Sequence, residues 1–279
     1  MISPLVWMLK RPGLLIPVFF LLAIHAHVSG QFTLPETSTA ALGGAFVTRA
    51  GFSCGGLNQA GLGAREQNSL TLQHSRPYLL RELGQSSLSG QFLSGNGSLG
   101  IVLSTQGIKG LRQSSLWLSY GLKLHPDVST GMGIHFWNSS MAEQAFHAPG
   151  ISFALGIRVR IQQRWMVGAH VLHPASWSSL SLPSTSPGMT IAAGFSYTFL
   201  KSATIYSEVH IKSRYGIILV EGLEWQLNKR VSMSTGFANT PFTFSWGISL
   251  LHSHWCIQFA FQYRTTSGTV PLSSLSYAW

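Results

Sequence analysis

The alternation of bulky apolar residues with small residues constrains the fold of this chain most strongly. In Ile151–Ile161 every odd position is large and apolar, and the even positions are Ser152, Ala154, Gly156, Arg158 and Arg160. Met189–Phe199 and Trp255–Tyr263 repeat the pattern. Since successive side chains of a β-strand point to opposite faces, these segments predict strands with one bulky apolar face and one small, mildly polar face.

The segment Val270–Trp279 shows the same alternation and ends on an aromatic residue. Its bulky residues Leu275, Tyr277 and Trp279 are separated by serine or alanine. Transmembrane β-barrels have an outward apolar band flanked by aromatic residues at the membrane interfaces. We therefore expect Leu275, Tyr277 and Trp279 to form the closing-strand signal that the barrel assembly machinery uses in the outer membrane.

The composition agrees with a surface that lies mostly in lipid. Apolar residues make up 45% of the sequence and charged residues only 9%, against roughly 25% charged residues in soluble domains. A soluble β-sandwich or propeller is the alternative, but no blade-length repeat is evident. The net charge of +10 is scattered, which favours contacts with outer-membrane lipids and lipopolysaccharide over nucleic acid.

Turn residues divide the chain after about residue 68 into about fourteen strands. We predict strands near 68–75, 85–93, 97–105, 114–124, 128–137, 149–161, 164–172, 187–199, 203–212, 215–226, 230–237, 241–251, 254–263 and 270–279. Tight turns alternate with longer loops, notably Asn138–Ala148 and His173–Pro187. This pattern predicts an all-β, antiparallel up-and-down transmembrane barrel (66–279) with both termini in the periplasm.

The first thirty residues have the features of a signal peptide. Lys10 and Arg11 precede the apolar run Leu14–Ile24, and small residues follow up to Gly30. A transmembrane anchor is the alternative, but this run is shorter than the roughly 20 residues that a spanning helix needs. We expect residues 1–30 to direct export to the cell outer membrane and to be removed.

Residues 31–65 do not alternate and are rich in glycine and alanine. Glycine allows sharp turns and close approach of one backbone to another, which suits a segment folded inside a barrel lumen. We predict that residues 31–65 form a periplasmic or lumenal hatch. Its candidate residues are Gly43, Gly44, Phe46, Asn58 and Gly61.

Two motifs in the predicted hatch resemble those of a known family. Gly43–Val47 reads GGAFV, and Asn58–Leu62 reads NQAGL, with Gln59 where the family has proline. The chain resembles FadL-like outer-membrane barrels, and most closely the PorV/PorQ-type proteins of Bacteroidota that are associated with type IX secretion. The resemblance implies about fourteen strands and an N-terminal hatch.

Three functions are consistent with this resemblance. The first is a non-enzymatic accessory of protein secretion or surface assembly, with secretion-system membrane proteins as partners. The alternatives are a FadL-like transport channel for hydrophobic small molecules, and a structural outer-membrane barrel. No pattern of acidic residues, histidines or serines predicts catalysis or a metal site, and no cofactor is expected.

The inward positions of the predicted strands carry only a few polar and charged groups. We expect Lys123, Arg158, Arg160, Glu208 and His210 in the lumen. For Arg158 and Arg160, solvation at the periplasmic mouth is the simpler interpretation. A diffusion porin would instead present dense, opposed charges.

The two cysteines could form a disulfide in the oxidising periplasm. Cys54 lies in the predicted hatch, and Cys256 lies on the predicted lumenal face of its strand. A Cys54–Cys256 bond would tie the hatch to the wall. The alternative is two small buried residues that never meet, because alternation fixes the face of the strand but not the height.

Overall fold

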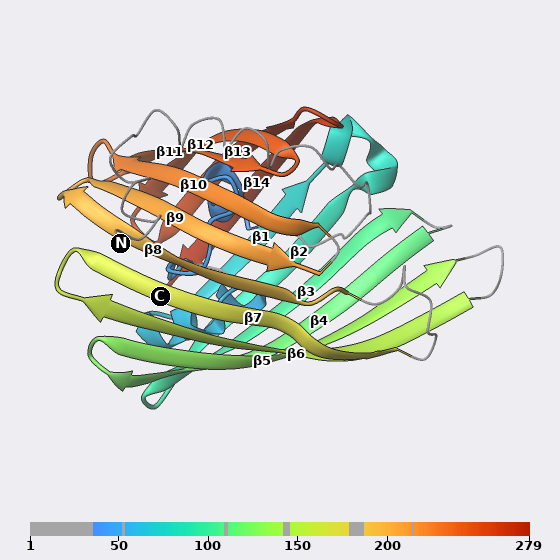
Figure 1. The fold of residues 1–279 in the computed structure, drawn as a ribbon, viewed down its shortest axis with the longest axis horizontal. Coiled ribbons are helices and arrows are strands. Elements are labelled where there is room, and N and C mark those ends of the chain that lie inside the picture. Colours follow the sequence, from blue (N-terminus) through green and yellow to red (C-terminus); the bar gives the residue numbers. More distant parts are fainter. Residues whose placement is uncertain (1–35, 52–53, 109–110, 142–145, 179–186, 214) are drawn as a thin grey trace, which may run out of the picture.

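The protein folds into a closed barrel of fourteen antiparallel strands (Figure 1). The computed structural model describes residues 36–51, 54–108, 111–141, 146–178, 187–213 and 215–279. The predicted signal peptide and residues 31–35 lie outside these ranges. Each strand pairs with its neighbours in the chain, and β1 pairs with β14 to close the ring. The predicted fold class is therefore confirmed.

The strands agree closely with the predicted segments. They are β1 (Ser69–Ser75), β2 (Gln85–Ser94), β3 (Gly97–Ile108), β4 (Leu111–His125), β5 (Val128–Met141), β6 (Phe146–Ile161), β7 (Trp165–Ser178), β8 (Thr190–Leu200), β9 (Ala203–Lys212), β10 (Gly216–Gln226), β11 (Val231–Asn239), β12 (Phe242–His252), β13 (Trp255–Arg264) and β14 (Gly268–Ala278). Two short 3-10 helices, η4 (Pro77–Leu79) and η5 (Arg81–Leu83), connect β1 to β2.

Strands continue into both of the predicted long loops. β5 continues to Met141 and β6 begins at Phe146, within the predicted loop 138–148, while β7 continues to Ser178. Figure 1 shows β4 to β7 extending beyond the rest of the wall. Alternation lapses there, as in Asn138–Ser140, because strand pairing needs only backbone hydrogen bonds where no lipid imposes an apolar face.

Closure of the ring satisfies the backbone hydrogen bonds that an open sheet would leave unpaired. The seam runs from Ser69 paired with Ala278 to Ser75 paired with Leu272. Beyond it, Asn68 and Trp279 exchange two backbone hydrogen bonds of 3.1 Å. A closed barrel is one of the few structures that can cross a membrane, because each unpaired backbone group in hydrocarbon costs several kcal/mol.

The outer face is the bulky face of the alternation. Leu72, Leu155 and Phe259 are each about half exposed, like most outward apolar residues. Aromatic side chains gather near one end of the barrel, where Trp255 packs on Tyr277 (ring centroids 4.7 Å apart) and Tyr277 stacks on Trp279 (5.8 Å). This face has the apolar band and aromatic girdle of a barrel wall in lipid. Among the described residues, no helix is long and apolar enough to cross a membrane.

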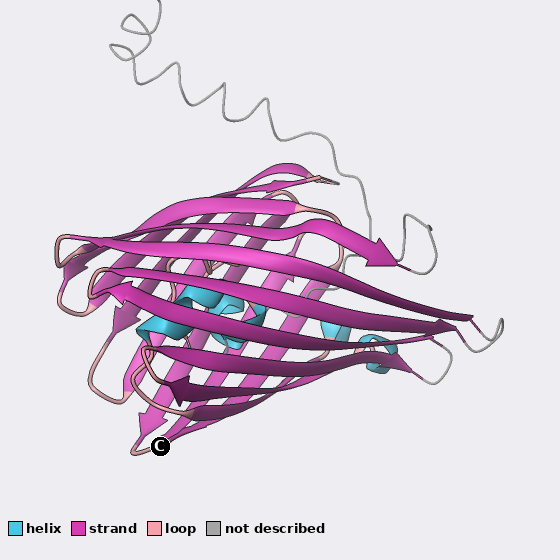
Figure 2. Ribbon diagram, turned by 90° about the horizontal axis from the view of Figure 1, so that it is seen from below, coloured by secondary structure: helices cyan, strands magenta, loops and turns pink. Residues whose placement is uncertain are grey.

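Short helices lie inside the barrel, surrounded by the strands (Figure 2). They are α3 (Thr37–Ala41), η2 (Cys54–Gly56) and η3 (Gln59–Ala64), all within the predicted hatch. Helix α3 packs against β11 to β14, and η3 packs against β3 to β6. The described part of the hatch, residues 36–51 and 54–65, therefore crosses the lumen from one side of the wall to the other.

Inward-facing glycines let the hatch backbone lie directly on the wall. A Cβ at Gly131 would fall on the backbone of Gln59, and a Cβ at Gly236 would fall on the backbone between Leu42 and Gly43. At Gly168 a Cβ would lie 2.8 Å from the Val47 side chain. The small inward-facing residues of the strands therefore leave room for the hatch inside the barrel.

We expect the Gly131→Ala and Gly236→Ala variants to be destabilised by about 1–3 kcal/mol. The added methyl group would meet backbone atoms of the hatch, which cannot move aside as a flexible side chain can. Gly56→Ala is the matched control, since its Cβ would meet nothing nearer than 3.8 Å. Urea unfolding in detergent measures the free energies. Equal stability of all three variants would contradict tight packing of hatch against wall.

Candidate functional site: the hatch and the inner wall

The GGAFV run makes the tightest turn of the hatch. Gly43 and Gly44 have φ values of +73° and +105°, which side chains with a Cβ rarely adopt. The amide of Gly43 donates to Ser245 Oγ on β12 (2.8 Å). A Cβ at Gly43 would lie 2.7 Å from the Phe237 carbonyl oxygen, whereas the space beside Gly44 is open. At Gly43 a side chain would both clash with the wall and strain the backbone. At Gly44 only the positive φ favours glycine.

Glu208 on β9 holds the segment that follows this turn. Its carboxylate accepts hydrogen bonds from the backbone amides of Phe46 (3.1 Å) and Val47 (2.8 Å). His210 Nε2 lies 2.8 Å from the same carboxylate. The Glu208 side chain is fully buried, so these partners are what stabilise a carboxylate there.

The Phe46 ring lies among the histidines of the wall. It packs on His170 (5.5 Å between centroids) and on His210 (5.1 Å). Glu208, His210 and Phe46, which were predicted separately for lumen and hatch, therefore meet at one contact.

Asn58 and Gln59 fix the second half of the hatch. Asn58 Nδ2 donates to the Val47 carbonyl (2.5 Å), and Asn58 Oδ1 caps η3 by accepting from the amide of Ala60 (3.1 Å). Gln59 Oε1 lies 3.0 Å from His170 Nε2. Gly61 donates from its amide to the Asn58 carbonyl (2.9 Å). Side-chain hydrogen bonds thus hold the turn that proline would otherwise restrict.

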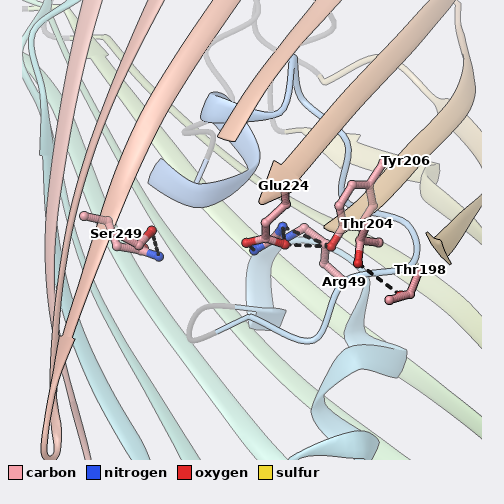
Figure 3. Close-up of polar contacts among 7 residues, drawn as sticks. Arg49, Thr198, Thr204, Tyr206, Glu224 and Ser249 are labelled. Carbon is pink, nitrogen blue, oxygen red and sulfur yellow. Dashed lines mark hydrogen bonds and ion pairs between the residues drawn. The ribbon is translucent and has the colours of Figure 1, made fainter. Parts of the chain in front are cut away.

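Arg49 of the hatch meets Tyr206 and Glu224 of the wall in one polar cluster (Figure 3). Arg49 forms an ion pair with Glu224 on β10 (3.0 Å), and Tyr206 on β9 donates to the same carboxylate (2.8 Å). Burial disfavours a charged guanidinium, but the carboxylate of Glu224 raises the pKa of Arg49 above its ordinary value. Arg158 Nε donates to the Thr48 carbonyl (2.9 Å). Arg49 is therefore a permanent cation in the hatch.

The predicted lumen residues divide into two groups. Arg158 is buried and bonded to the hatch, so solvation at the mouth does not describe it. Arg160 and Lys123 are exposed near the ends of β6 and β4. Arg49, Tyr206 and Glu224 were not predicted as site residues, although Tyr206 and Glu224 occupy inward positions of alternating strands.

On the other side of the hatch, the inner wall along β1 to β4 carries neutral side chains, whereas Lys212 on β9 and Arg264 on β13 place two cations near each other. A chain of hydrogen bonds runs from Ser75 to Gln85 (3.3 Å), on to Gln106 (2.9 Å) and to Gln113 (2.7 Å). On the adjacent strands β4 and β5, the rings of the paired residues Trp117 and His135 stack with centroids 4.2 Å apart. Polar groups that bond to each other in this way present few charges to a passing molecule.

A serine–histidine contact in the lumen does not form a catalytic site. Ser152 Oγ lies 2.6 Å from His173 Nδ1, but Ser152 is fully buried and a nucleophile must reach its substrate. His170 instead bonds to the hatch through Gln59. In the part of the chain that the structure describes, no three histidine, cysteine or acidic residues gather as a metal site.

Cys256 does not form the disulfide with Cys54 that the sequence leaves possible. Cys256 on β13 is a buried free thiol. Helix η2, which begins at Cys54, packs against β3 and β4, and β14, β1 and β2 separate β3 from β13 around the ring. Cys256 faces the lumen, as the alternation predicts. The alternation does not indicate which strands each part of the hatch packs against.

Solved structures with a similar fold are outer-membrane transport proteins. The toluene transporter TodX of Pseudomonas putida superimposes with a TM-score of 0.66 at 10% identity, covering 91% of this chain and 98% of TodX. The Ralstonia pickettii toluene transporter TbuX gives a TM-score of 0.60 at 13% identity, with coverages of 86% and 96%. A Pseudomonas aeruginosa FadL homologue gives 0.62 at 11% identity, with coverages of 90% and 99%.

At these identities the likeness is one of fold. No protein-family model matches the chain, and no curated protein matches it. The chain therefore has the barrel fold of FadL-type transport proteins. These neighbours are channels and not enzymes, which is consistent with a non-enzymatic protein.

We expect Glu208→Ala to loosen the hatch, because two buried backbone amides lose their acceptor at about 1–3 kcal/mol each. Hydrogen exchange at the amides of Phe46 and Val47 should become at least tenfold faster, and Glu208→Gln should have a smaller effect. Glu82→Gln, an exposed carboxylate outside the hatch contacts, is the control. Unchanged exchange in Glu208→Ala would exclude this carboxylate as the hatch anchor.

Proposed function

We propose that this protein is an outer-membrane channel that admits small hydrophobic molecules past its N-terminal hatch. In this proposal residues 1–30 direct export, both termini lie in the periplasm, and Leu275, Tyr277 and Trp279 serve as the assembly signal. Lipopolysaccharide and outer-membrane lipids surround the barrel. Passage requires the hatch to move, since residues 36–51 and 54–65 occupy the lumen.

The main support for this proposal is that hydrogen bonds to wall side chains hold the hatch inside the barrel. A segment held by a limited set of polar contacts, such as Glu208 with Phe46 and Val47, can move without unfolding the wall. The neutral part of the lumen along β1 to β4 favours uncharged molecules, because a charged solute would lose hydration there without gaining partners. The fold shared with two toluene transporters supports the same class of molecule.

The secretion hypothesis is not supported. The GGAFV run, on which the PorV/PorQ-type interpretation rested, is mostly buried in the lumen and presents little surface to a secretion partner. The named structural neighbours also favour the hydrophobic channel, and none of these findings supports an association with type IX secretion or Bacteroidota.

Uptake by intact cells tests the proposal. We expect Gram-negative cells that lack their own FadL-type protein to take up radiolabelled toluene several times faster when they express this chain, because lipopolysaccharide slows hydrophobic entry. Sucrose uptake should not change. Uptake equal to that of the empty-vector control, with the barrel correctly inserted, would refute the hydrophobic channel.

A further inference from the structure

A polar cavity of about 510 Å³ lies beside the hatch, on the side of the tight turns. The hatch contributes Thr48, Arg49 and Ala50 to its lining, and the wall contributes residues of β6 to β10 together with the turn between β6 and β7. The neutral glutamine chain of β1 to β4 is absent from the lining. The cavity is thus separate from the neutral part of the lumen.

The lining of this cavity has a large excess of positive charge. Its charged side chains are four arginines, at positions 49, 158, 160 and 164, and one carboxylate, Glu224. The carboxylate forms its ion pair with Arg49. Arg160 and Arg164 are exposed at the opening of the cavity, where solvent keeps the cost of charge low. The lining therefore holds more cationic than anionic side chains, with Arg160 and Arg164 in its exposed part.

Hydroxyl groups of β8 and β9 complete the lining. Thr198 and Thr204 face each other with their Oγ1 atoms 3.0 Å apart, and Ser196 lies on the same strand as Thr198 (Figure 3). Guanidinium groups match the oxygens of phosphate in pairs, and hydroxyls supply further donors. Tetrahedral phosphate oxygens can accept from guanidinium and hydroxyl donors in several directions, whereas the two oxygens of a carboxylate lie in one plane, so a phosphate group suits this mixed lining better.

We propose that this cavity binds a phosphate group, supplied either by free inorganic phosphate or by the headgroup of a phospholipid. Arg160 and Arg164 capture the anion at the opening, and the buried Arg158 sets the positive potential behind them. The site does not depend on which molecule crosses the lumen, so loss of phosphate binding would leave the proposed hydrophobic channel intact.

Calorimetric titration of the full-length barrel in nonionic detergent tests the site. The two probes are inorganic phosphate and water-soluble dihexanoyl-phosphatidylglycerol. We expect saturable binding of at least one probe and an increase in Kd of about tenfold or more in Arg160→Gln/Arg164→Gln, as expected when two charge-assisted contacts are removed. Arg230→Gln, at another turn at the same end of the barrel, is the matched control and should bind like the parent.

The two probes distinguish free phosphate from a phospholipid headgroup as the ligand. Binding of inorganic phosphate supports a free-anion site, and binding of the phospholipid alone supports a headgroup site. Absence of binding by both probes would overturn the proposal. So would an equal Kd for the parent and the double variant, or an equal loss in Arg230→Gln, since binding would then follow overall charge.

Discussion

The close contact between the hatch backbone and the glycine-lined inner wall is the interaction on which the rest of this structure depends. Gly131 and Gly236 leave room for the hatch, and Glu208 then bonds to the amides of Phe46 and Val47. A bulkier inner face would exclude the segment. Without the segment, the buried carboxylate of Glu208 would lose two of its partners.

This contact divides the lumen into two chemical environments. On one side, the wall along β1 to β4 is neutral and its glutamines bond to each other. On the other side, arginines and hydroxyls line a cavity beside Arg49 and Thr48. Because hatch residues lie at the boundary, any displacement of the hatch changes both environments at once. The same segment can therefore close the hydrophobic path and shape the anion cavity.

The sequence was sufficient to predict the barrel. The requirement for an apolar outer face imposes a period of two on each strand, and this period is visible without knowledge of the partners. The ends of β5 and β7 were missed, because pairing continues there without an apolar face. The inward orientation of Glu208 and His210 was also predictable from the alternation.

The contacts of the hatch could not be predicted in the same way. Phe46 and Glu208 are 162 residues apart in the chain, and the hatch has no periodicity that would fix its path across the lumen. For the same reason, the sequence did not predict the ion pair between Arg49 and Glu224. It also could not show that Cys256 lies away from the part of the hatch that holds Cys54. Only the three-dimensional path of the hatch decides which wall residues it meets.

An engineered cysteine pair tests the central claim most directly. In a background with both native cysteines replaced by serine, Gly56→Cys/Val102→Cys joins the hatch to β3 and should oxidise readily, because a Cβ at Gly56 lies 3.9 Å from the Val102 side chain and meets no backbone atom. Mass mapping under non-reducing conditions identifies the bond. We predict that the oxidised barrel does not take up toluene and that reduction restores uptake. Failure of the pair to bridge, or full uptake by the bridged barrel, would contradict a movable hatch in the lumen.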